Sequence, residues 1–261
     1  MKELGEIPRI EPPAGVVVAE EQPRPECSTC SSRGMLVSTG KAGLVTAYCP
    51  DCSLDEEVAR RLTYTNLPSG LAEANLDDLV RPAAFTDGAW EDFQELVDYA
   101  DAYAHSLDTV AVWLLLAGTK GWGKTTIACA ILAHRAKYHP ELIPGKFANC
   151  PVLLQELRRG YKDDTYEETL DLYLEVPLLM LDDLGVEYHK RQKDGELSWA
   201  EEQIYQIING RYAMRLPTII TTNADAEKID ERLVDRAQDE GSGLVKVWAR
   251  NWPSFRKEGA A

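Results

Sequence analysis

The sequence predicts an α/β domain with a parallel sheet built around a phosphate-binding loop, preceded by a small zinc ribbon. Three observations lead to this prediction. A glycine-rich loop lies between an apolar strand and a helix, a second apolar strand ends in two acids, and two pairs of closely spaced cysteines lie near the N-terminus. The length of 261 residues is typical of one medium-sized domain together with a second, smaller one.

The composition excludes several classes of protein. Hydrophobic residues make up 44% and charged residues 27%, as in ordinary globular proteins, so we do not expect wholesale disorder. No run resembles 18 consecutive apolar residues, and the first ten residues lack the apolar core of a signal peptide. We therefore expect a cytoplasmic protein with no membrane partner. The net charge of −15 argues against a broad, nonspecific grip on nucleic acid, although it leaves room for a local basic strip.

The cysteine pairs predict a small module near the N-terminus that is stabilised by a bound metal ion. Two CxxC turns separated by 18 residues match a four-thiolate zinc site, which is structural because four thiolates leave no open position for water. The alternatives are structural disulfides and a redox-active CxxC motif. A reducing compartment disfavours structural disulfides, and a redox motif would explain only one of the two cysteine pairs. Short strands at 35–37 and 44–46 complete a ribbon. The expected zinc ligands are Cys27, Cys30, Cys49 and Cys52.

The ends of this module can be placed from composition. The first residues are rich in proline and glutamate and predict a mobile arm. Between the cysteine pairs, Arg33 and Lys41 have no acidic neighbours, which suits a protein or a nucleic acid equally. We expect an arm over 1–26, the zinc-binding module over 27–55, a linker over 56–75 and the nucleotide-binding domain over 76–261.

The phosphate-binding loop follows an apolar strand expected at 110–117. Residues 118–125 match GxxxxGK(S/T), and a helix follows, which is the context that the motif requires. Lys124 would reach the β- and γ-phosphates of ATP, and Thr125 would hold Mg²⁺. A plain glycine-rich turn is the alternative. The residues expected to contact the nucleotide are Gly118, Gly121, Trp122, Gly123, Lys124, Thr125 and Thr126.

Two further strands end in polar residues. The strand at 178–183 ends in Asp182, which would hold Mg²⁺, and Asp183, which is placed to orient or deprotonate an attacking water. Alone, this pattern is also that of a strand entering a polar turn. The strand at 217–223 ends in Asn223, which either reaches a water near the γ-phosphate or caps the following turn.

These motifs together resemble the AAA+ ATPases of the DnaC/DnaI helicase-loader group, which includes the IstB-type transposition ATPases. The resemblance extends from about Leu67 to Phe255 and rests on GTKGWGKTT, LLMLDDLG, SWAEEQIYQIINGRY, PTIITTN, DERLVDR and NWPSFR. It implies a RecA-like AAA+ fold for the ATPase domain. The four-cysteine module is similar to the helicase-binding domain of DnaI-type loaders.

The resemblance also implies roles for individual residues. Asn223 matches sensor 1, Arg236 the arginine finger offered to a neighbour's ATP, and Arg256 sensor 2; Arg232 matches the first arginine of the ERxxDR pattern. Asp183 stands where AAA+ proteins at large usually have glutamate, so hydrolysis is expected to be slow.

The implied function is an ATP-dependent loader of a replicative hexameric DNA helicase onto single-stranded DNA, with self-assembly through the ATP interfaces. A transposition helper ATPase is the first alternative. A small-molecule P-loop kinase would not need the three sensor and finger residues, and a nucleotide-gated adaptor without meaningful hydrolysis stays open because of Asp183.

The basic segments, the isolated cysteines, the aromatic residues near position 90 and the histidines remain to be interpreted. Two basic segments are candidates for DNA contact. The loop 186–197 could instead be a solvated loop, and the segment 158–162 (RRGYK) could instead be an ordinary helix C-terminus. Cys129 and Cys150 are expected to be buried as small hydrophobes. Helical spacing predicts that Trp90, Phe93, Leu96 and Val97 are core residues. The four histidines are not spaced in the sequence as metal ligands usually are; they are His105, His134, His139 and His189.

Overall fold

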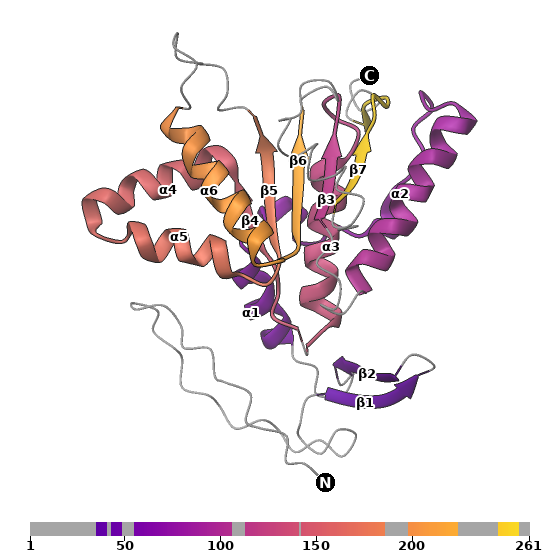
Figure 1. The fold of residues 1–261 in the computed structure, drawn as a ribbon. Helices are drawn as coiled ribbons and strands as arrows, with labels where there is room; N and C mark the ends of the chain where they lie inside the picture. The colour runs from indigo at the N-terminus through magenta and orange to yellow at the C-terminus, as the bar shows by residue number, and fades with distance from the viewer. Residues whose placement is uncertain are drawn as a thin grey trace.

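The centre of the molecule is a five-stranded sheet in which all neighbouring strands are parallel (Figure 1). The computed structural model describes residues 35–40, 43–48, 55–105, 113–140, 142–185, 198–223 and 245–255. The strand order is β4-β5-β6-β3-β7, so the strand before the phosphate-binding loop, β3, has a neighbour on each side. The strands are β3 (Trp113–Ala117), β4 (Lys146–Asn149), β5 (Leu179–Leu184), β6 (Thr218–Thr222) and β7 (Val245–Ala249).

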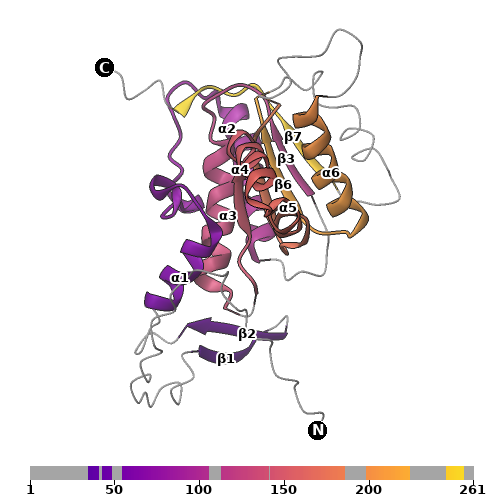
Figure 2. The same cartoon turned by 90° about the vertical axis from the view of Figure 1, so that its left-hand side faces the viewer.

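Helices pack on both faces of this sheet, which explains why its strands are apolar without alternation. Leu114 and Leu116 of β3 belong to one hydrophobic cluster with α2 and α3, whereas Leu115 and Ala117 belong to a second cluster with α4, α5 and α6. Figure 2 shows the sheet between α3 and α6. The helices are α1 (Asp55–Thr65), α2 (Asp87–His105), α3 (Lys124–Tyr138), α4 (Cys150–Asp163), α5 (Tyr166–Glu175) and α6 (Trp199–Ala213).

The expected core residues are in place. Phe93 and Leu96 of α2 are fully buried, and Trp90 and Val97 are partly buried against the same cluster. Cys129 and Cys150 are both buried, as predicted. Two short 3₁₀ turns, η1 (Ser69–Leu71) and η2 (Leu76–Asp78), connect α1 to this core.

Helix α1 occupies much of the stretch for which the sequence suggests a linker, 56–75, and it packs against α3. The buried guanidinium of Arg61 donates hydrogen bonds to carbonyl oxygens at and beyond the end of α3. The acceptors are Arg135 at 3.2 Å, Ala136 at 2.9 Å, His139 at 2.8 Å and Leu142 at 2.8 Å. One side chain therefore binds carbonyl groups of the last turn of α3 and of the segment that follows it, where a helix C-terminus needs additional donors.

The N-terminal part contains the expected hairpin. Strands β1 (Met35–Gly40) and β2 (Gly43–Tyr48) are antiparallel, with Val37 opposite Thr46. The four cysteines expected to bind zinc lie outside the described residues, and so do the arm over 1–26 and the basic loop 186–197. Among the described residues, no helix is both long and apolar enough to cross a membrane.

Helix α6 is fixed at both ends by side-chain hydrogen bonds. Ser198 and Glu201 form a capping box at its start. Near its end, Arg211 is fully buried and donates to the carbonyl oxygens of Val176 at 2.7 Å and Pro217 at 2.8 Å. Burial lowers the pKa of Arg211 to about 9. These bonds connect the start of β6 to the segment between α5 and β5, and so hold two of the strands that support the candidate site.

Candidate nucleotide-binding site

The phosphate-binding loop has the backbone geometry that its glycines permit. Gly118, Gly121 and Gly123 have φ of 119°, 95° and 100°, a region that side-chain-bearing residues rarely adopt. A Cβ atom on Gly118 would lie 1.8 Å from the carbonyl oxygen of Arg250, and one on Gly121 would lie 2.1 Å from Oγ of Ser254. Two of the glycines are therefore required both by conformation and by the chain segment packed against them.

That segment is residues 250–255, which we call the C-terminal strap. The Arg250 amide donates to the carbonyl of Ala117 and the Phe255 amide to that of Gly121, both at 3.0 Å. The hydroxyl of Thr119 donates to the carbonyl of Trp252 at 3.1 Å. These three bonds hold the end of β3 and the loop against the strap over its whole length.

Lys124 is the first residue of α3 and is buried. Its Nζ atom donates to the carbonyl oxygens of Gly118 at 3.0 Å and Thr119 at 2.6 Å, so the ammonium group lies inside the curve of the loop. The N-terminus of α3 adds its backbone amides and its dipole at the same place, which favours an anion. The indole of Trp122 is fully buried and packs edge-on against Trp252, with ring centres 5.1 Å apart. Only its backbone is left to contribute to nucleotide binding.

A hydrogen-bond network joins α3 to the carboxyl ends of β5 and β6. The hydroxyls of Thr125 and Thr221 both donate to Oδ1 of Asp182, at 2.8 and 2.7 Å. Asp182 is buried, with 5% of its surface exposed. A buried carboxylate is stable only when it is well bonded, and these two hydroxyls supply such bonds.

A β-bulge turns Asp183 toward the same edge of the sheet. Successive side chains of a regular strand point to opposite faces, so Asp182 and Asp183 would normally separate. Between Leu181 and Leu184, however, β5 has one residue more than its partner β6, and Asp183 takes a left-handed conformation with φ of 57°. Its Oδ1 atom accepts a hydrogen bond from Nδ2 of Asn223 at 2.8 Å. The two acids and Asn223 thus lie at one edge.

The structure therefore brings together five of the predicted site residues: Lys124, Thr125, Asp182, Asp183 and Asn223. Thr126 follows Thr125 in α3 and is half-buried. Arg236 and Arg256 lie outside the described residues. Sequence reasoning missed Thr221, whose hydroxyl also accepts from the Asp183 amide at 3.1 Å. The sequence signal that could have found Thr221 is a hydroxyl residue two positions before Asn223 in a strand that is expected to be buried.

Cys129 lies one turn into α3 and has no chemical role in the site. Burial, with the charge of Asp182 as a second cause, raises the pKa of its thiol. The thiol therefore stays protonated, because the thiolate is disfavoured both by the apolar surroundings and by the neighbouring negative charge. Its packing against Met180 agrees with the expected role as a small hydrophobe.

The segment 158–162 ends α4 and presents cations beside aromatic rings. The guanidinium of Arg158 lies 4.7 Å from the ring centre of Trp199, and Tyr161 stacks on Tyr166 at 4.3 Å. Tyr161 is 56% exposed. The segment is thus a helix C-terminus, and it also has the mixture of cations and exposed aromatic surface that single-stranded nucleic acid would need.

Comparison with known families identifies the domain. The model of the IstB-like ATP binding protein family matches residues 101–240, which include the phosphate-binding loop, both acids and Asn223. The chain belongs to this family. It is an ATP-binding AAA+ protein related to the DnaC/DnaI helicase loaders, with the five-stranded parallel sheet described above.

Individual relatives are of two kinds. The replicative helicase loader DnaI of Bacillus subtilis (strain 168) is 27% identical over 139 residues, which are 52% of this chain and 40% of that protein. The insertion sequence IS232 putative ATP-binding protein of Bacillus thuringiensis subsp. berliner is 31% identical over 122 residues, 47% of this chain and 44% of that protein. The matches thus span less than half of each relative. A crystal structure of DnaI matches with a TM-score of 0.50 at 26% identity, over 69% of this chain and 93% of that one.

Proposed function

We propose that this protein is an ATP-dependent loader of a replicative hexameric DNA helicase onto single-stranded DNA. The observation that carries the proposal is the network that joins Thr125 of α3 to Asp182, Asp183 and Asn223, because it couples the phosphate-binding helix to the strands beside it. The likeness to DnaI supports the choice of a helicase as partner.

The residues of the site fit MgATP. The loop glycines permit the backbone conformations in which amides curve around phosphates, and Lys124 supplies a cation beside them. Thr125 and Asp182 provide the hydroxyl and carboxylate oxygens that Mg²⁺ prefers, and they are already within hydrogen-bond distance of each other. Bound Mg²⁺ would neutralise charge on the phosphates.

Hydrolysis would depend on the second acid. Asp183 would accept the proton of a water that attacks the γ-phosphorus, while the bond from that phosphorus to the bridging oxygen of ADP breaks. Asn223 holds one oxygen of the Asp183 carboxylate and so fixes its orientation. The shorter reach of aspartate compared with glutamate is a reason to expect slow turnover.

Assembly and partner binding are assigned to other parts of the chain. Arg236 would act as the arginine finger on a neighbouring subunit's ATP, and Arg256 as sensor 2. Single-stranded DNA would contact the segment 158–162 and the loop 186–197. The zinc-binding module, with one Zn²⁺ held by its four cysteines, would bind the helicase.

One observation favours a second candidate, a transposition helper ATPase. The relative from the IS232 insertion sequence is somewhat more identical to this chain than DnaI is, over a slightly shorter stretch. Such a helper would partner a transposase and bind duplex DNA, for which a net charge of −15 is unfavourable.

The two functions can be separated by binding experiments on the full chain. With MgATP, the wild type is expected to co-purify with the hexameric replicative helicase of its host and to bind single-stranded DNA in preference to duplex. A variant lacking residues 1–55 should keep its ATPase activity but lose the helicase. Binding of duplex DNA and a transposase, without the helicase, would instead assign the protein to transposition.

A further inference from the structure

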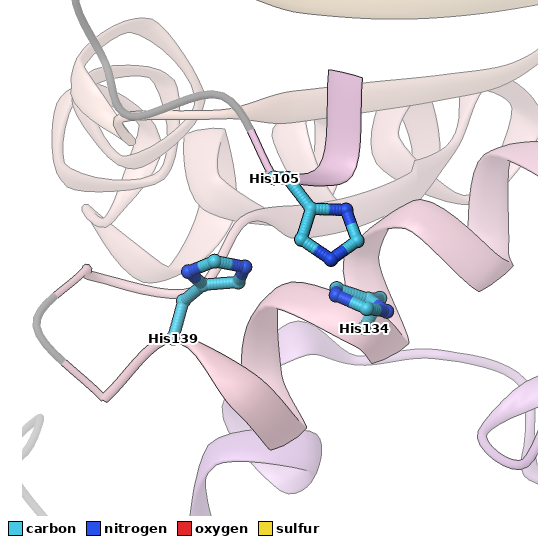
Figure 3. A group of neighbouring side chains, drawn as sticks. All are labelled: His105, His134 and His139. Carbon is cyan, nitrogen blue, oxygen red and sulfur yellow. The ribbon is translucent and has the colours of Figure 1, made fainter. Parts of the chain in front are cut away.

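Three histidines that are distant in sequence meet at the end of α3 that is remote from the phosphate-binding loop. His105 is the last residue of α2, His134 lies in the final turns of α3, and His139 directly follows that helix. Their spacing in sequence indicates no metal site, but the fold brings their rings side by side (Figure 3). They account for three of the four histidines in the chain.

The rings are close enough to share one ion. One ring nitrogen from each histidine lies within 4.8 Å of the other two. The ring centres are 4.3 Å apart for His105 and His134, and 5.6 Å for each of these with His139. In a tetrahedral zinc site with Zn–N bonds of about 2.0–2.1 Å, two ligand nitrogens are about 3.3 Å apart. A closure of about 1.5 Å is thus needed, on a cluster in which the side chain of His105 is 52% exposed.

One hydrogen bond determines which ring nitrogen of His105 is available to bind a metal ion. Its Nδ1 atom lies 2.8 Å from the carbonyl oxygen of Asp101, which can only accept, so Nδ1 is the protonated nitrogen. In the neutral ring the lone pair is then on Nε2. Metal-binding histidines typically have such a bond from the other ring nitrogen, which fixes the tautomer and the ring orientation.

His134 provides a second, independent observation. Its Nε2 atom is buried and has no hydrogen-bond partner among the residues that the structure describes. A buried polar atom without a partner is costly, and a bound ion would remove that cost.

We propose that His105, His134 and His139 form a further metal site, apart from the nucleotide site and the four cysteines, which binds a divalent transition-metal ion such as Zn²⁺. Imidazole nitrogens suit Zn²⁺, Cu²⁺ and Ni²⁺ and are poor ligands for Mg²⁺. Three protein ligands leave one position for water or for an acid. Asp101 lies near the other ring nitrogen of His105, with Oδ1 at 3.7 Å from Nδ1, so water is the expected fourth ligand.

The position of this metal site indicates a structural role, joining helices, and not a role in ATP hydrolysis. Helix α3 has 15 residues, so its two ends are about 22 Å apart at 1.5 Å per residue. An ion here would join the end of α2 to the end of α3. It would also fix the segment to which α1 is bound, since Nη2 of Arg61 donates to the carbonyl oxygen of His139 at 2.8 Å.

The test compares metal binding by the full chain and by three variants. His105→Gln and His134→Gln each remove one proposed ligand, and His189→Gln removes the one histidine outside the cluster. Zinc content after dialysis against zinc equimolar to the protein, and the cobalt absorption spectrum, are measured for each. Circular dichroism and nucleotide binding confirm that each variant is folded.

The wild type and His189→Gln are expected to bind one more zinc ion per chain than either cluster variant. Zinc affinity at this site should fall by at least roughly tenfold in His105→Gln. Cobalt at this site should give visible bands without thiolate-to-metal charge transfer, which separates it from any four-cysteine site. Equal zinc content in all four proteins, or an equal loss in His189→Gln, would overturn the proposal. So would binding that appears only at a large excess of zinc.

Discussion

Replacing Thr221 by valine tests whether the hydrogen-bond network sets the position of the two acids. The substitution keeps the shape of the side chain but removes a hydroxyl that donates to Asp182 and accepts from the amide of Asp183. Thr221 is buried in β6, so water cannot readily replace its hydroxyl. Both acids therefore lose a bond that holds them at the carboxyl edge of the sheet.

The expected magnitude follows from the charge on one partner. A hydrogen bond to a charged group contributes about 1.5–3 kcal/mol, and each 1.36 kcal/mol of barrier is tenfold in rate, so kcat for ATP hydrolysis should fall roughly 10- to 150-fold. ATP affinity should change less, because Lys124 and the loop amides are untouched. The measurement is steady-state ATPase activity together with nucleotide binding by calorimetry.

The neighbouring residue provides the matched control. Thr222 is equally buried in the same strand, but its hydroxyl donates to the backbone carbonyl of Leu184 at 2.8 Å and not to either acid. Thr222→Val should lose about 1 kcal/mol of stability, as for an ordinary neutral hydrogen bond, and keep most of its ATPase activity. If Thr221→Val hydrolyses ATP as fast as Thr222→Val, the network does not position the acids and the reasoning is wrong.

Other parts of the account can be tested in the same way. Lys124→Ala should abolish MgATP binding in a calorimetric titration, because the phosphates lose their main cation, and wild-type hydrolysis by this variant would refute the role of the loop. Arg236→Ala should bind ATP but lose turnover by a factor of about 10³ or more, and mixing it with Lys124→Ala should restore some activity if the arginine acts in trans. Elemental analysis of freshly reduced protein should show one zinc ion per chain fewer when the four cysteines are replaced by serine. Arg61→Gln should lower the free energy of unfolding by about 3 kcal/mol in urea, whereas the exposed neighbour Arg60→Gln should have little effect.

The sequence predicts the parts of the fold that depend on local pattern. The apolar runs before Gly118, Asp182 and Asn223 predict three strands of a parallel sheet, and the structure confirms these strands. That their ends meet at one edge is seen from the hydrogen bonds of the structure. Strand β7 and the strap were not predicted, because a short strand becomes recognisable only from its pairing with β3.

Other features depend on contacts that no local pattern records. The role of Thr221 depends on its register opposite the bulge in β5, and a bulge has no fixed sequence signature. The histidine cluster needs α2 to end beside the last turns of α3. The burial of Trp122 likewise depends on Trp252, a residue from the far end of the chain. Each of these follows from tertiary packing, which a motif search does not contain.

The central claim is that this protein uses ATP to place a replicative helicase on single-stranded DNA. The direct measurement is the number of helicase hexamers that stay bound to circular single-stranded DNA after a salt wash, with and without this protein and MgATP. The account predicts that the wild type raises this number and that Lys124→Ala, which should not bind ATP, leaves it at the level without loader. An ATPase-active wild-type protein that leaves the number of bound helicase hexamers unchanged would contradict it.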